Sequence, residues 1–120
     1  MLKNPARSVI DTNVLVSAII FGGNPKKVIN LISENKIIAI TSQSLISEFL
    51  EVLVKKFSFT PEKLYLAEEL IKENFIIVHP HVTLNIVRDR DDNRVLEAAI
   101  KGKCKYVITG DVDLLELNSF

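Results

Sequence analysis

Acidic side chains at separate points of the chain are the residues best able to do chemistry. Asp11 follows the apolar run Ser8–Ile10, and Asp111 follows the apolar run Tyr106–Thr109. Carboxylates can bind a hard divalent cation such as Mg²⁺ or Mn²⁺, because these ions prefer oxygen ligands. Each acid also has an ordinary alternative: Asp11 taken singly is typical of a helix cap, and Asp111 is typical of a turn.

Two further acids have no such ordinary role in the sequence. Within the helix expected from Ser44 to Phe57, Glu51 has Lys55 four residues later, the favourable order for a surface ion pair. Glu48 lies instead at the margin of the apolar arc, with no lysine or arginine four residues away. Asp92 shares a face with the apolar residues three, four and seven positions later, so we expect it to point inward. A carboxylate in such a place is costly unless something compensates its charge.

The remaining acids have local explanations. Asp113 and Glu116 have the spacing of a capping box, which predicts a helix from Leu114 onward. Glu97 has Lys101 at i+4 and is expected to form a surface pair with it. A structural interpretation of every acid, as a cap or a solvated surface group, therefore stays open.

The elements that position these acids alternate along the chain. Apolar periodicity, caps and breakers predict short strands and intervening helices. The expected strands are Ser8–Ile10, Lys36–Ile40, Phe75–Val78 and Tyr106–Thr109; the expected helices are Val14–Ile20, Lys26–Glu34, Ser44–Phe57, Pro61–Asn74 and Asp92–Lys101, the last with Gly102 at its C′ position. This alternation predicts an α/β fold with three layers, α/β/α, around a central parallel sheet of about four to five strands.

The predicted fold brings the acids together. In a parallel sheet, ligands bind outside the carboxyl ends of the strands, where Asp11 and Asp111 fall. The helix that begins with Asp92 opens near the same edge, and Glu48 can reach it from a helix flank. Carboxylates that converge in this way repel one another, and a Mg²⁺ or Mn²⁺ ion would relieve the repulsion.

Composition excludes several other classes of protein. The chain has 120 residues, 15 basic and 15 acidic, with 48% apolar and 25% charged residues, which indicates one globular domain rather than a disordered tail or a supercharged nucleic-acid coat. A single cysteine, Cys104, allows no internal disulfide and indicates a reducing compartment. The longest largely apolar stretch, Val14–Phe21, has 8 residues including Ser17 and is too short for a membrane helix. No signal peptide is evident, so we expect a cytoplasmic protein. His79 and His81 do not match zinc spacing and are expected at the surface.

Four segments that contain these acids resemble the motifs of the PIN-domain family. They occur in the family's order and on the expected elements: Val9–Leu15, Ser44–Phe49, Asp91–Ala99 and Val107–Leu115. The subgroup most similar in these motifs is the prokaryotic toxin components of toxin–antitoxin pairs, the VapC-like ribonucleases. Family members usually continue past the fourth motif with another helix and a final strand. We therefore expect residues 1–120 to form a single PIN-like domain that lacks them.

The resemblance implies a metal-dependent ribonuclease that hydrolyses phosphodiester bonds with Mg²⁺ or Mn²⁺. Asp11, Glu48, Asp92 and Asp111 would be the catalytic, metal-binding acids, with Asp113 as an accessory ligand. Two further residues, Asn13 and Thr109, would hydrogen-bond to the acids and orient them. The implied partners are an RNA substrate, a second copy in a homodimer, and an antitoxin protein that blocks the acidic site.

Basic residues near the acids are candidates for binding RNA, although a solvated surface role is equally open. They are Arg88, Arg90, Arg94, Lys26 and Lys27. A rival hypothesis is a non-catalytic PIN module that binds RNA or a protein partner. A receiver-type phospho-acceptor domain is less well supported, because that class has an acidic pair after the first strand and a lysine after the last.

Overall fold

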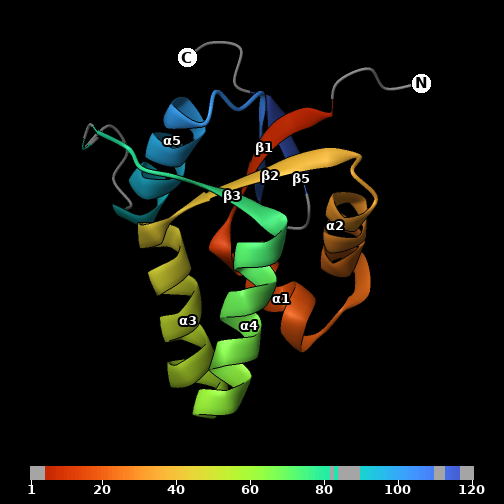
Figure 1. The fold of residues 1–120 in the computed structure, drawn as a ribbon, viewed down its shortest axis with the longest axis vertical. Helices are drawn as coiled ribbons and strands as arrows, with labels where there is room; N and C mark the ends of the chain where they lie inside the picture. The colour runs from red at the N-terminus through yellow and green to blue at the C-terminus, as the bar shows by residue number, and fades with distance from the viewer. Residues whose placement is uncertain (1–4, 82, 84–89, 110–112, 117–120) are drawn as a thin grey trace.

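The computed structural model describes residues 5–81, 83, 90–109 and 113–116, and for residues 24–26, 90–92 and 113–116 it describes the backbone alone. Strands and helices alternate through most of this part of the chain (Figure 1). The strands are β1 (Ala6–Ile10), β2 (Ile37–Ser42), β3 (Phe75–Val78), β4 (Tyr106–Thr109) and β5 (Asp113–Glu116). The helices are α1 (Thr12–Ile20), α2 (Gly23–Ser33), α3 (Gln43–Phe57), α4 (Pro61–Asn74) and α5 (Arg90–Lys101).

The strands form one sheet in the order β3-β2-β1-β4-β5. The pairs β3–β2, β2–β1 and β1–β4 are parallel, and β5 runs antiparallel to β4 at the edge. The predicted parallel sheet of four to five strands is confirmed. The helix expected from Leu114 is wrong, because Asp113–Glu116 forms a strand whose Leu114 pairs in register with Ile108. Pairing with β4 has overridden the local capping signal.

Helices cover both faces of the sheet, which confirms the three-layer fold. In Figure 1, α5 lies above β2 and β3, while α1, α2, α3 and α4 lie below them. Alternate strand residues point to opposite faces. Ile10 and Ile108 pack in the core under α1–α4, while their neighbours Val9 and Val107 pack against α5.

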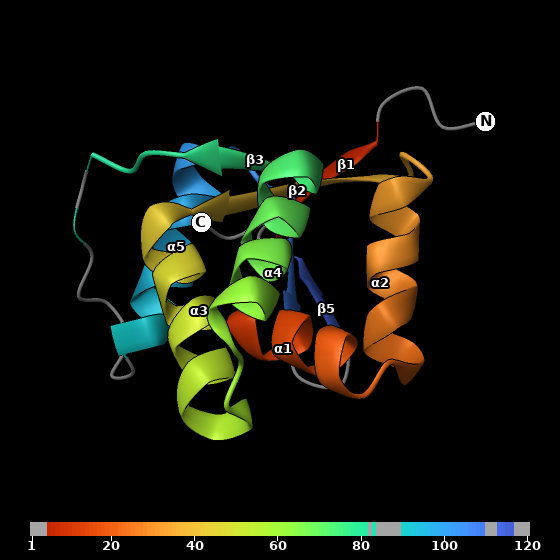
Figure 2. The ribbon, with the colours of Figure 1, turned by 60° about the horizontal axis from the view of Figure 1, so that its bottom comes forward.

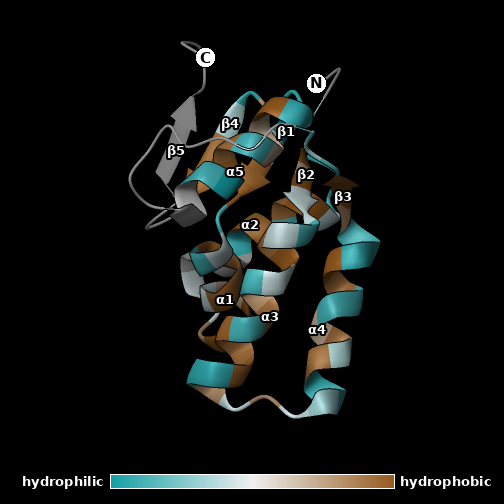
Figure 3. Ribbon diagram, turned by 90° about the vertical axis from the view of Figure 1, so that its left-hand side faces the viewer, coloured by the Kyte–Doolittle hydropathy of each residue, from teal (hydrophilic) through white to brown (hydrophobic). Residues whose placement is uncertain are grey.

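The α3–α4 hairpin is defined by its caps. The Ser42 hydroxyl accepts a hydrogen bond from the Leu45 N–H, and the Thr60 hydroxyl accepts one from Lys63 ahead of the N1 proline. Ser58 ends α3 in the left-handed conformation, with φ 53°. In Figure 3, apolar and polar segments alternate along both helices, as expected for helices with one face in the core.

The topology sets where a site can form. Helix α1 begins directly after β1, and α3 begins directly after β2, so both helices start at the carboxyl edge of the parallel strands. The beginning of α5 lies near the first turns of α3 in Figures 1 and 2, and the two helices are in contact. Three elements that carry predicted acids thus start at one edge of the sheet. No helix within the described ranges is long and apolar enough to cross a bilayer.

Candidate metal centre

Asp11 occupies the junction between β1 and α1. Its backbone N–H donates to the Ile108 carbonyl at 2.9 Å, which ties the end of β1 to β4. Its carboxylate caps α1 by accepting from the Asn13 backbone N–H at 3.3 Å, and it also accepts from the Thr109 hydroxyl at 3.1 Å. The carboxyl group is therefore held by β4 and by the start of α1, while the residue stays partly exposed. The interpretation of Asp11 as a helix cap is therefore correct, and the hydrogen bond from Thr109 is an additional contact that capping does not require.

The two residues expected to orient the acids differ in what they contribute. Thr109, at the end of β4, donates its side-chain hydroxyl to Asp11. Asn13 donates its backbone N–H, while its side chain is exposed. Of this pair, Thr109 is the one whose described side chain holds the carboxylate.

Glu48 lies on the second turn of α3 and is half-buried. Its neighbours Leu45 and Phe49 are fully buried, so Glu48 sits at the margin of the core, as its place on the helix predicts. Glu51 is exposed and pairs with Lys55 at 3.2 Å, which confirms the ordinary surface role expected for that acid. The two glutamates on one helix thus occupy different environments.

Of the three other predicted acids, the structure describes only the backbone of two. Asp92 lies in the first turn of α5, a helix that contacts α3. Asp113 begins β5 and pairs in register with Thr109, the residue that holds Asp11. Asp111 lies outside the described residues. The capping-box interpretation of Asp113 is wrong, because Asp113–Glu116 forms the strand β5.

The predicted cations are spread over the fold. Lys27 is exposed near the start of α2, and Figures 1 and 2 place α2 on the opposite side of the molecule from α5. Lys26 precedes it in the sequence, and Arg90 lies at the start of α5. For both residues the structure describes only the backbone. Arg88 is outside the described residues. His79 and His81 are exposed, as expected.

A buried polar group on α5 was missed by sequence reasoning. Glu97 is buried and forms an ion pair with Arg94, with 2.9 Å between the Arg94 Nη2 and the Glu97 Oε2 atoms. Asn93 is also buried. The surface pair expected between Glu97 and Lys101 is wrong. Glu97 can pair with Arg94, three residues before it, or with Lys101, four residues after it, and of these two cations only Arg94 is withdrawn from solvent. Periodicity alone does not distinguish these two pairings.

The donor set suits Mg²⁺ or Mn²⁺ rather than a soft metal. Asp11 presents a carboxylate whose two oxygens each accept one hydrogen bond, which leaves further lone pairs on both. The buried hydroxyl of the next residue, Thr12, has no hydrogen-bond partner among the described residues. Among the side chains that the structure describes, no three acids, histidines or cysteines gather as a metal-binding group. The side chains of Asp92, Asp111 and Asp113 are not among them.

Comparison with known proteins identifies the fold. The family model described as PIN domain matches residues 7–113, nearly all of the chain. The chain belongs to the PIN-domain family. It is also 34% identical, over 98% of its own length and 78% of its relative's, to the uncharacterized protein MJ1680 of Methanocaldococcus jannaschii.

Membership in the PIN-domain family carries a general activity. PIN domains are generally nucleases, hydrolases that act on nucleic acid and typically use divalent metal ions. The matched range includes all the predicted acids from Asp11 to Asp113. The fold of this PIN domain places the starts of α1, α3 and α5 at the edge where such an enzyme would bind its substrate.

Proposed function

We propose that this PIN domain is a metal-dependent endoribonuclease, with Asp11, Glu48, Asp92 and Asp111 as its catalytic, metal-binding acids and Asp113 as an accessory ligand. The observation that carries the proposal is the carboxylate of Asp11, held at the carboxyl edge of β1 and β4 by the Thr109 hydroxyl. A carboxylate fixed in this way has little conformational freedom to lose when it binds a ligand.

The chain's own residues then have distinct roles in hydrolysis. Asp11 and Glu48, approaching from the end of β1 and the flank of α3, hold negative charge at the site, and Thr109 fixes the orientation of Asp11. A bound Mg²⁺ or Mn²⁺ ion supplies Lewis-acid polarisation of the phosphate and lowers the pKa of a water molecule. We assign no covalent nucleophile to the chain.

The decisive experiment is cleavage of a mixed pool of structured and single-stranded RNAs in Mn²⁺, in Mg²⁺ and in EDTA. We expect cleavage only with a metal ion, and a fall of orders of magnitude in Asp11→Asn and in Glu48→Gln. Glu51→Gln is the matched control, because it removes a carboxylate from the same helix as Glu48 but from an exposed surface pair. Equal cleavage by Glu48→Gln and Glu51→Gln would remove Glu48 from the site.

The nucleic acid used is part of the same test. A parallel pool of single-stranded DNA distinguishes a ribonuclease, which cleaves only the RNA pool, from a nuclease that cleaves DNA. Absence of cleavage of either pool by folded protein would favour a non-catalytic PIN module that binds RNA or a protein.

We also propose that four basic residues bind the RNA substrate. Arg90 and Arg88 lie two and four residues before Asp92 along the chain. Lys26 and Lys27 would contact RNA farther from the site because α2 lies across the fold. RNA affinity should then fall as salt rises, since phosphate contacts release counterions. An affinity that is equal at low and high salt would contradict this assignment.

Protein partners complete the proposal: a homodimer, and an antitoxin that covers the acids, both in the cytoplasm. An arginine side chain from an antitoxin would suit the site, because its planar guanidinium matches carboxylates. Light scattering of the purified chain tests the first part, with twice the 13.5 kDa chain mass expected. A mass of one chain at micromolar concentration would contradict the homodimer.

A further inference from the structure

The first turns of α5 hold a buried ion pair that the proposed reaction does not use. Arg94 and Glu97 are three residues apart, and their side chains are only 18% and 9% exposed. The exposed pairs of the same fold provide a contrast, since Lys55 and Glu51 are 72% and 64% exposed at 3.2 Å. The Arg94–Glu97 pair is therefore the one ion pair in the described ranges that is withdrawn from solvent on both sides.

The location of the pair on α5 is also unusual. Val95, Ala98 and Ala99 form the face that packs on the sheet. At about 100° per residue, Glu97 lies on the side of the helix opposite to Val95. The contact between α5 and the sheet therefore does not by itself explain the burial of Glu97.

A buried pair of this kind is poorly explained as a source of stability. Removing two charged groups from water costs several kcal/mol per ion, roughly what their attraction returns, so a well-packed apolar pair is often as stable. What an arginine–carboxylate pair does provide is a fixed geometry, because the guanidinium is planar and its donors are rigidly arranged. The pair spans the turn of α5 that directly follows Asp92.

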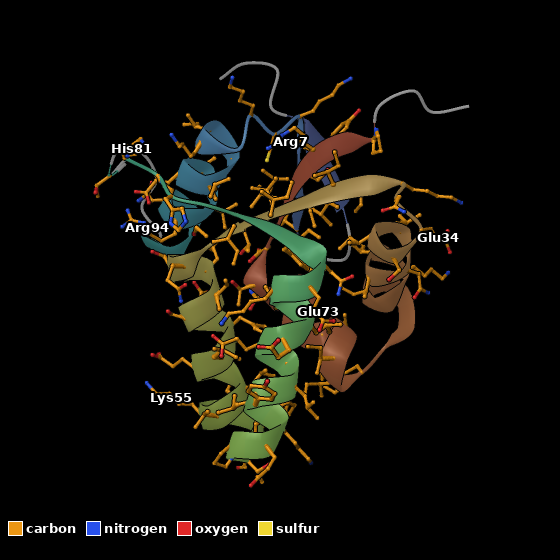
Figure 4. All side chains as sticks on the ribbon, viewed as in Figure 1. Arg7, Glu34, Lys55, Glu73, His81 and Arg94 are labelled. Carbon is orange, nitrogen blue, oxygen red and sulfur yellow. The ribbon has the colours of Figure 1, made fainter. Side chains whose placement is uncertain are left out.

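Figure 4 shows the Arg94 side chain where α5 meets the beginning of α3, the helix that carries Glu48. Its guanidinium is largely buried and engaged with Glu97, so it has little surface to offer an RNA phosphate. This differs from the substrate-binding role that its place in a run of charges suggests.

We propose that Arg94 and Glu97 form a positioning pair, which fixes the first turns of α5 so that Asp92 is correctly placed relative to Glu48, and that Arg94 does not bind RNA. The proposal rests on the proposed metal site, since Asp92 and Glu48 are the groups it positions. Neither Arg94 nor Glu97 touches the substrate, and the two act as a unit.

The test measures Mn²⁺ affinity by calorimetry or electron paramagnetic resonance, independently of cleavage. We expect Arg94→Gln and Glu97→Gln each to weaken Mn²⁺ binding about 10- to 100-fold, as loss of an orienting group does. The double variant should bind Mn²⁺ no more weakly than either single variant, because each change already breaks the pair. The matched control is the exposed pair, and Glu51→Gln with Lys55→Gln should leave Mn²⁺ affinity unchanged.

RNA binding in EDTA separates positioning from substrate contact. A positioning role predicts that Arg94→Gln changes neither the affinity for RNA nor its salt dependence. An RNA contact predicts weaker binding and a salt slope smaller by about one in Arg94→Gln, with no such change in Glu97→Gln. That second pattern would overturn the proposal.

Two further variants keep the test valid if a lone buried charge unfolds the protein. Arg94→Met combined with Glu97→Leu removes both charges at similar volume, and it should remain folded yet bind Mn²⁺ weakly. Arg94→Lys keeps the charge without the planar guanidinium and should retain part of the Mn²⁺ affinity. Wild-type Mn²⁺ affinity in the folded Met/Leu variant overturns the positioning pair alone. Failure of the wild type to bind Mn²⁺ overturns the proposed metal site and the positioning pair together.

Discussion

At the scale of single residues, the hydroxyl of Thr109 is the clearest support for Asp11. Thr109→Val removes the donor at 3.1 Å but keeps the shape and β-branching of the side chain. We expect Mn²⁺ affinity, or the rate of cleavage, to fall about 10- to 100-fold, because the carboxylate loses an orienting partner. Thr109→Ser is the control and should retain most of both. Equal values for the valine and serine variants would show that this hydrogen bond does not matter to the site.

Cys104 gives a second prediction for a single residue. Burial raises the pKa of its thiol from 9.0 to about 11, while the positive charge of Arg7 acts in the opposite direction to a smaller extent. Since the thiolate is the reactive form, alkylation by iodoacetamide at pH 8 should be about 100-fold slower in the folded protein than in the same chain in denaturant. Arg7→Gln should slow it further. Equal rates in folded and denatured protein would contradict the raised pKa.

The same shift predicts how stability changes with pH. The folded state favours the neutral thiol, so the contribution of Cys104 is fully present below pH 9 and is lost as pH rises from 9 to about 11. Comparing denaturation of the wild type and Cys104→Ala across this interval checks the sign. The difference in unfolding free energy between them should move in favour of the alanine variant as pH rises.

The acids show how far single residues can be interpreted from sequence. Glu48 was singled out because no lysine or arginine one turn away explains it, and it lies at the margin of the core as expected. Asp11 was singled out by its place after a strand, and its carboxylate accepts from Thr109 of the neighbouring strand. Glu97 was missed because a local partner, Lys101, was available to explain it. Burial depends on what packs over a side chain from elsewhere in the chain, and no local spacing reports it.

At the scale of elements, the end of α5 makes a testable contact with β2. The sequence suggests Gly102 for the left-handed C′ position, but Lys103 takes it, with φ 53°. The N–H of Cys104 closes the turn on the Ala99 carbonyl at 2.9 Å. Gly102 is instead needed for close approach, because a Cβ atom there would lie 2.6 Å from the Ile40 Cγ2 atom.

This geometry predicts opposite effects at adjacent positions. Gly102→Ala should lower the free energy of unfolding by about 1–3 kcal/mol, because the added methyl forces α5 away from β2. Lys103→Gly should be neutral or stabilising, since glycine adopts the left-handed conformation without strain. Lys101→Ala is the control for an exposed alanine substitution and should change stability by less than about 0.5 kcal/mol. Chemical denaturation of the three variants measures this, and an unaltered Gly102→Ala would contradict the contact.

Elements with strong local signals could be predicted from sequence almost to the residue. Helix α4 follows its threonine cap and first-turn proline, and β3 and β4 have the predicted bounds. Strand β5 could not be predicted in the same way. Its four residues contain a capping pattern, and they form a strand because they pair with β4. Such pairing is a property of the assembled sheet.

At the scale of the whole molecule, the proposed site should make stability depend on metal. The chain has equal numbers of acidic and basic groups, so any repulsion among the acids is local to the carboxyl edge of the sheet. In EDTA, Asp92→Asn should therefore be at least as stable as the wild type, because one repelling charge is gone. In Mn²⁺ the order should reverse, since only the wild type gains the full free energy of binding.

The size of this reversal follows from mass action. A metal ion at 100 times its Kd stabilises the state that binds it by about 2.7 kcal/mol, which raises the Tm of a small domain by about 10 °C. Thermal unfolding of the wild type, Asp92→Asn and the Glu51→Gln control, each in EDTA and in Mn²⁺, measures it. We expect the wild type and the control to gain stability together while Asp92→Asn gains little. If Mn²⁺ left the Tm of all three unchanged, the acids at this edge would not form a metal site. Elsewhere among the described side chains, no three acids, histidines or cysteines gather to provide another one, and Glu51 and Glu68 are engaged with Lys55 and Lys72 at the surface.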